Sequence, residues 1–186
     1  MILTSEQLHE MIPLASDRKV DMFLVPLNRA MQEFNITKPL QIAAFIAQIA
    51  HESGSLHYVE EIADGSWYEF RKDLGNLEFE ALQIAHANGS TTGVWYKGRG
   101  LIQLTGYYNY KACGKGLKAD LLTNPKLLCE PEYAARSAAW FWDSRNLNNF
   151  ADVGLFGATT KAINGGFNGA VERIANYARC KKVLSC

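Results

Sequence analysis

The stretch FIAQIAHESGSLHYVEE, residues 45–61, joins a long apolar run to a cluster of polar and acidic residues. From Leu40 to Ile49 the chain is apolar all round, which predicts a central, buried helix. Ser53 and Gly54 are poor helix residues, and glycine commonly stands where a helix ends. We therefore predict that the helix stops just after Glu52 and that the chain turns there.

This turn decides whether two carboxylates can act together. In an unbroken helix, Glu61 would lie about 13 Å along the axis from Glu52 and about 180° round it. A turn instead lets Glu60 or Glu61 fold back towards Glu52. The negative end of the helix dipole and partial burial both favour the protonated form of Glu52, as a general acid requires. A solvent-facing glutamate that merely ends a helix is the alternative, and such structural residues are more common.

A metal site is a further alternative, because His51, Glu52, His57 and Glu61 lie within eleven residues of one another. The zinc pattern on a helix needs two histidines four residues apart on one face. Here the two histidines are six residues apart and the predicted break lies between them. The sequence therefore predicts a pair of carboxylates, with no metal and no other cofactor.

The chain has 186 residues, of which 48% are hydrophobic and 20% charged, so we expect one packed domain over residues 1–186. Lys and Arg number 19, as do Asp and Glu, so no overall field favours nucleic acid. The first residues, MILTSEQLHEM, do not resemble a secretory signal, and no apolar run approaches the roughly 20 residues that span a bilayer. The four cysteines are expected to be free thiols, although a bridge between Cys113 and Cys129 would be possible outside the cell.

Signals for helices occur nearly throughout the chain. Thr4 and Gln7 form a capping box, and Pro26 is expected to kink or restart a helix that Asp17 caps. Loops with a short helix over 77–86 are expected between 64 and 98, and the segment from 98 to 110 is predicted to be extended. Further helices are predicted from Thr37 onward with Pro39 in the first turn, and over 131–143, 152–163 and 168–182.

Two other motifs, GRGLIQLTGYYNY at 98–110 and NGG at 164–166, follow the opening stretch along the chain. With these three motifs in order, the sequence resembles glycoside hydrolase family 19 from about residue 28 to residue 177. That family contains chitinases and a branch of phage and prophage endolysins. The resemblance implies a mainly α, lysozyme-like fold of two lobes with a catalytic cleft. It also implies hydrolysis of a β-1,4 linkage next to an N-acetylated sugar, with inversion at the anomeric carbon.

The resemblance also implies roles for particular residues. Glu52 matches the general acid and Glu61 the general base, although the adjacent Glu60 is the alternative base. Thr105 matches the hydroxyl residue that holds the attacking water, where plant members have Ser. An inverting hydrolase needs its carboxyl groups roughly 6.5 to 9.5 Å apart, which the predicted turn permits.

Substrate-binding residues follow from the same motifs. Amides suit N-acetyl and hydroxyl groups, and aromatic rings offer flat faces for sugars. Tyrosines that simply pack, an asparagine that only ends a helix and an arginine in a structural ion pair are the alternatives. The predicted substrate-binding set is Gln103, Asn109, Tyr107, Asn164, Arg173 and His51, and Tyr108 and Trp95 offer further aromatic faces.

The sequence favours peptidoglycan over chitin as the polymer, because an export signal is not apparent. We therefore expect a monomeric endolysin with muramidase activity that stays in the host cytoplasm until a holin releases it to lyse the cell. Residues 1–186 are expected to form its single catalytic domain, without a separate wall-binding module. A chitinase is the alternative, and a non-catalytic wall-binding protein and a zinc amidase are more distant ones. The basic C-terminal helix, with Arg179, Lys181 and Lys182, is expected either to be solvated or to contact an anionic outer membrane weakly.

Overall fold

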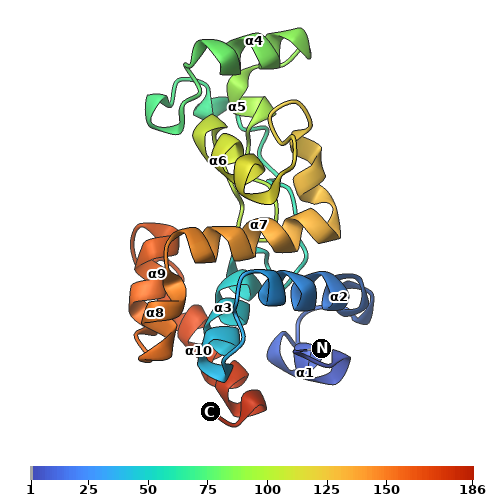
Figure 1. The fold of residues 1–186 in the computed structure, drawn as a ribbon, viewed down its shortest axis with the longest axis vertical. Coiled ribbons are helices and arrows are strands. Elements are labelled where there is room, and N and C mark those ends of the chain that lie inside the picture. The colour runs from blue at the N-terminus through green and yellow to red at the C-terminus, as the bar shows by residue number, and fades with distance from the viewer. Residues whose placement is uncertain (1) are drawn as a thin grey trace.

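Helix α3 (Pro39–Glu52) lies at the centre of the fold, as its apolar run predicts (Figure 1). The computed structural model describes residues 2–186, and within it every residue of α3 from Gln41 to Ala50 is buried. Helix α10 (Ala170–Leu184) packs along α3. Helices α2 (Asp17–Glu33) and α7 (Pro131–Ser144) pack against each other. This helical core supports the end of α3, where Glu52 lies.

The helices form two groups with α7 between them (Figure 1). One group comprises α4 (Phe79–Ala87), α5 (Thr92–Trp95) and α6 (Tyr107–Leu117). The other comprises α2, α3 and α10 with α1 (Ser5–Met11), α8 (Leu147–Asp152) and α9 (Phe156–Asn164). In residues 2–186 the only β structure is a pair of isolated bridges, Glu60 to Arg99 and Arg99 to Leu104. The prediction of a mainly α, two-lobed fold is therefore confirmed.

Most predicted helices form, and the differences have local causes. The capping box of Thr4 and Gln7 is present, and Pro26 lies inside α2 without ending it. The predicted helix over 152–163 starts later, as α9 at Phe156, and the preceding α8, which ends at Asp152, was not predicted. The segment predicted to be extended makes a tight turn between its bridged residues and then enters α6 at Tyr107. The aromatic residues and glycines of α6 have low helix propensity, which is why the pattern did not indicate a helix there.

All four cysteines are free, and burial raises the pKa of the Cys113 and Cys180 thiols to about 12. These two buried thiols therefore remain protonated and unreactive at neutral pH. Among the residues that the structure describes, no helix is both long enough and apolar enough to span a bilayer.

Candidate active site

The turn that the sequence predicts after α3 is present and unusually tight. Glu52 is the last residue of α3, and the next turn has three consecutive residues with positive φ: Gly54 at 55°, Ser55 at 60° and Leu56 at 65°. Left-handed backbone is costly for residues other than glycine. Here the buried Ser53 hydroxyl donates to the Ile49 carbonyl at 2.6 Å and accepts from the Leu56 amide at 2.8 Å. Together with the complete burial of Leu56, these bonds hold the reversal in place.

Beyond the turn, the two adjacent glutamates have different partners. Glu60 pairs with Arg99 at 2.9 Å and lies 3.6 Å from the Lys97 ammonium group. The Glu61 carboxylate instead accepts hydrogen bonds from the Tyr68 hydroxyl at 3.1 Å and the Gly98 amide at 3.2 Å. Burial and then the charge of Glu61 raise the pKa of Tyr68, so that hydroxyl remains a donor. The Glu61 carboxylate is therefore held by neutral donors, and that of Glu60 by cations.

Glu61 meets the second motif at Gly98. A Cβ atom on Gly98 would lie 3.0 Å from the Gln103 side-chain oxygen, 3.2 Å from a Glu61 carboxylate oxygen and 3.3 Å from the Thr105 hydroxyl. These three oxygens therefore surround the space that a side chain on residue 98 would occupy. Gln103 has a positive φ of 54°, and its side-chain amide donates to the Gly100 carbonyl at 3.0 Å. The Thr105 hydroxyl donates to the Gln103 carbonyl at 2.9 Å, so the turn fixes both side chains beside Gly98.

Two adjoining cavities contain most of the predicted site residues. One of about 320 Å³ is lined by Glu52, Gln103, Thr105, Asn109 and Asn164, among others. The second, of about 250 Å³, is lined by Glu52, Glu61, Gln103, Tyr58 and Glu60 with two neighbours. Because both cavities include Glu52 and Gln103, they meet at these two side chains. The structure thus brings both candidate catalytic glutamates to the wall of one cavity.

A buried polar network stands behind Glu52. The guanidinium of Arg173 pairs with the Glu52 carboxylate and also donates to the Gln48 side-chain oxygen at 2.5 Å. The Gln48 amide in turn donates to the hydroxyls of Thr159 at 3.1 Å and Thr160 at 2.8 Å. All of these residues except Glu52 are buried. Helices α3, α9 and α10 are therefore linked at the base of the candidate acid.

Two residues predicted to bind substrate, Arg173 and His51, line neither of the two cavities. Arg173 is only 2% exposed and pairs with Glu52, so it acts through that carboxylate and does not contact a substrate. The expectation of a protonated Glu52 considered the helix dipole and burial, and it omitted this cation. The His51 ring lies against Gly169 and pairs with Glu172 at 2.9 Å. His51 lines neither cavity.

The prediction for Tyr107 is wrong. Its side chain is 2% exposed, it packs edge-on against Tyr96 with ring centroids 5.7 Å apart, and its hydroxyl bonds to Glu80. Its ring is therefore not available to a sugar. The ring nitrogen of Trp95 bonds to the Leu122 carbonyl, which directs this indole towards the protein interior. The aromatic residues that do line the cavities are Tyr58 and Phe141.

Sequence reasoning also missed residues that the structure brings to the site. Gln48 was visible as a polar residue inside an apolar run, which signals a buried hydrogen-bond partner. Arg145 lines the larger cavity, its guanidinium lies 3.5 Å from the Phe141 ring centroid, and burial lowers its pKa. No motif marks Arg145, because its position depends on how α7 meets α8.

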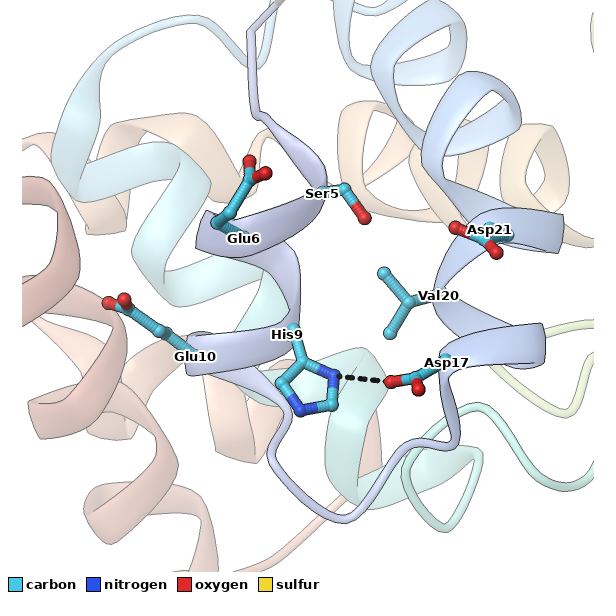
Figure 2. A pocket seen from close by; sticks show the side chains of 7 residues that line it. All are labelled: Ser5, Glu6, His9, Glu10, Asp17, Val20 and Asp21. Carbon is cyan, nitrogen blue, oxygen red and sulfur yellow. Dashed lines mark ion pairs between the residues drawn. The ribbon is translucent and has the colours of Figure 1, made fainter.

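A third cavity, of about 390 Å³, lies between α1 and α2 and shares no residue with the other two (Figure 2). It is lined largely by carboxylates, and His9 lies 3.6 Å from Asp17. In Figure 2 the carboxylates of Glu6 and Glu10 point away from that pair. Over residues 2–186, no group of three or more His, Cys, Asp or Glu side chains is arranged to hold a metal ion.

Known proteins resemble the chain in both sequence and fold. Residues 30–152 match the family model described as Chitinase class I. An endochitinase of Arabidopsis thaliana is 43% identical over 143 residues, which are 74% of this chain and 45% of the plant protein. The chain thus spans about half the length of the curated relatives it matches.

Solved structures give the same match for the fold. The crystal structure of chitinase C from Streptomyces griseus HUT6037 has a TM-score of 0.78 at 26% identity, over 99% of this chain and 77% of that one. A bacterial family 19 chitinase has a TM-score of 0.76, also at 26% identity, over 99% of this chain and 95% of that one. The likeness therefore extends over both groups of helices.

Proposed function

Because the chain belongs to glycoside hydrolase family 19, we propose that it hydrolyses β-1,4 bonds in polymers of N-acetylglucosamine, with inversion at the anomeric carbon. One observation carries this proposal: Glu52 and Glu61 line the same cavity, although nine positions separate them in the chain. The tight turn after Ser53 makes this possible. In this proposal the glycan binds along the two adjoining cavities that meet at Glu52 and Gln103.

Each carboxyl group has a distinct task in this reaction. Glu52 donates a proton to the glycosidic oxygen as the bond from that oxygen to the anomeric carbon breaks. Glu61 accepts a proton from the water that attacks the opposite face of the sugar. Thr105, whose hydroxyl lies beside Glu61 around Gly98, helps to hold that water. The cationic partners of Glu60 make it the less suitable base.

Chitin-type oligomers are the leading substrate. The relatives in the comparison are chitinases and endochitinases, and the larger cavity offers the amides of Gln103, Asn109 and Asn164. Such amides donate to carbonyl oxygens and accept from N–H and hydroxyl groups, as an N-acetylated sugar requires.

Peptidoglycan is a second candidate, and Arg145 favours it. This guanidinium lines the larger cavity, where it can bind a carboxylate. The stem peptides of peptidoglycan carry carboxylates, whereas chitin has no anionic group. With this substrate the chain would act as a muramidase and lyse bacterial cells, as an endolysin does.

Product analysis tests the reaction. We expect chitohexaose to give products that are initially α anomers, measured by proton NMR during the first minutes of hydrolysis. E52Q and E61Q should each reduce kcat by at least about a thousandfold, because each removes an essential proton transfer. The control is E60Q, which changes the neighbouring carboxylate and should retain most of the activity. Initial β anomers, or an active E52Q enzyme, would refute the mechanism.

The two substrates are separated by digesting chitin oligomers and peptidoglycan in parallel. Mass spectrometry of the products shows which polymer is cut and which sugar carries the new reducing end. If peptidoglycan is the substrate, the new ends lie on muramic acid and R145Q lowers the rate on peptidoglycan more than on chitohexaose. Equal effects of R145Q on both polymers would remove the reason for preferring peptidoglycan.

A further inference from the structure

Large apolar side chains are exposed together on the three C-terminal helices and the loops between them. Val171 is 85% exposed and Ile174 59%, both on the outward face of α10, with Ala175 and Ala178 exposed at helical spacing. Five large apolar residues of this region are exposed, and we call them the C-terminal apolar surface: Val153, Leu155, Phe167, Val171 and Ile174. Its members come from the loop between α8 and α9, the loop between α9 and α10, and α10 itself, and three of them line one cavity, so the fold gathers these neighbouring segments into one apolar region.

This surface surrounds a groove. A cavity of about 440 Å³ lies between α9 and α10 and is lined by Leu155, Phe167 and Ile174 of the apolar surface, with Phe156 and Tyr177 among the other residues. Phe156 and Tyr177 are stacked, with ring centroids 4.2 Å apart and an angle of 4° between their planes. Sugar sites need several polar side chains that converge on the ligand. The mainly hydrocarbon lining of this groove suits an apolar ligand better.

Basic side chains flank the groove. From residue 153 to residue 186 the chain has five basic residues and one acidic residue, Glu172. The carboxylate of Glu172 pairs with His51, and Arg173 is buried against Glu52. Lys181 lies 5.4 Å from the centroid of the Tyr177 ring, which lines the groove. Lys161 follows Gly157 of the groove wall by four residues and so lies on the same side of α9.

The lysines beside the groove distinguish between two possible partners of the C-terminal apolar surface, a second copy of the chain and an anionic bilayer. In a two-fold dimer built on this surface, the lysines of both copies would be brought towards each other without compensating acidic groups. An anionic bilayer offers phosphates to the lysines and an acyl boundary to Val171 and Ile174. We propose that the C-terminal apolar surface binds the surface of an anionic phospholipid bilayer. Because these apolar side chains project from the outside of folded helices and loops, the contact is interfacial.

The proposed contact with a bilayer rests on exposed apolar side chains in the structure, and not only on the basic residues of the C-terminal helix. The sequence shows a basic C-terminal helix, which by itself is most simply a solvated one. The fold adds exposed Val171 and Ile174 on that helix and Phe167 and Leu155 beside it. None of these residues lines either cavity that contains the catalytic glutamates. Bilayer binding thus uses side chains other than those that line the catalytic cavities.

Cosedimentation with vesicles tests the proposal. The intact chain should bind vesicles of phosphatidylcholine mixed with phosphatidylglycerol and bind pure phosphatidylcholine much more weakly. I174D and V171D should each reduce the partition coefficient by about tenfold, because a charge replaces an apolar contact at the interface. K181Q should reduce it by about fivefold, and added salt should reduce it further.

A matched control comes from the other group of helices. Phe79 on α4 is 74% exposed, and F79D makes the same kind of change far along the chain from the C-terminal apolar surface. F79D should bind vesicles like the original chain, and all variants should hydrolyse chitohexaose equally well. This last readout separates the bilayer proposal from the proposed glycosidase activity.

Three results would overturn the proposal. The first is an absence of binding to anionic vesicles, and the second is binding that I174D leaves unchanged. The third is a concentration-dependent dimer, measured by sedimentation velocity, that I174D dissociates while vesicles bind neither protein. That third result would assign the C-terminal apolar surface to a second copy of the chain.

Discussion

At the scale of single residues, Gly98 lies where a side chain would crowd three oxygens of the site. A methyl group there would approach the side-chain oxygens of Gln103, Glu61 and Thr105 to between 3.0 and 3.3 Å. These side chains would have to shift by a few tenths of an ångström. We expect G98A to fold with nearly unchanged stability and to lose about tenfold in kcat, because small displacements of catalytic groups are costly.

The control for G98A is a glycine with room around it. A Cβ on Gly157 in α9 would have its nearest neighbour at 3.9 Å, so G157A adds the same methyl group without a close contact. Steady-state kinetics and urea denaturation on both variants make the comparison. If G157A loses as much activity as G98A, crowding at the site is not the cause.

Gln48 is a positioning residue for Glu52. Q48L removes the acceptor of Arg173 and leaves the Thr159 and Thr160 hydroxyls without their amide donor. We expect a loss of about 2–3 kcal/mol in the free energy of unfolding, because buried polar groups become unsatisfied. We also expect kcat to fall about tenfold with KM little changed, since Arg173 is then free to move relative to Glu52.

Gln41 provides the control, because it is another buried glutamine on α3 whose amide donates to Asp152 at 2.8 Å. Q41L should also destabilise the fold, and it should leave kcat and the pH–rate profile unchanged. In Q48L the alkaline limb of that profile should move, because that limb reports the group that donates the proton in the reaction. Equal kinetic effects of Q41L and Q48L would show that Gln48 serves stability alone.

At the scale of elements, the turn between α3 and the Glu61 segment places the two carboxyl groups. S53A removes one hydroxyl that both donates to the Ile49 carbonyl and accepts from the Leu56 amide. We expect it to lower the free energy of unfolding by about 1–3 kcal/mol, measured by urea denaturation. A stable S53A would mean that the burial of Leu56 alone holds the turn.

S55G should instead stabilise the chain by about 1 kcal/mol in the same measurement, because residue 55 has a φ of 60° that glycine adopts freely.

Elements defined by local signals were predictable, and contacts between elements were not. The apolar run, the capping box and the Ser-Gly-Ser break predict α3, the start of α1 and the reversal, because each depends on neighbouring residues. The ion pair of Arg173 with Glu52 joins residues 121 positions apart, so their distance is set only when α10 packs on α3. The burial of Tyr107 likewise depends on how α6 meets α4 and α5.

At the scale of the whole molecule, the fold brings residues of three motifs to two adjoining cavities. The motifs supplied Glu52, Glu61, Gln103, Thr105, Asn109 and Asn164, all of which line a cavity in the structure. The polymer was less predictable, because chitin and peptidoglycan share the β-1,4 bond and the N-acetylated sugar. A side chain outside the motifs, Arg145, bears most directly on that choice.

Thr160 belongs to both halves of this arrangement. It lines the groove between α9 and α10, and its hydroxyl accepts the Gln48 amide that leads through Arg173 to Glu52. A molecule that enters the groove and displaces Thr160 would therefore disturb the hydrogen bonds through Gln48 and Arg173 that position the Glu52 carboxylate. Thermodynamic linkage makes such an influence reciprocal, so a sugar chain seated beside Glu52 would alter adhesion at the groove by the same factor.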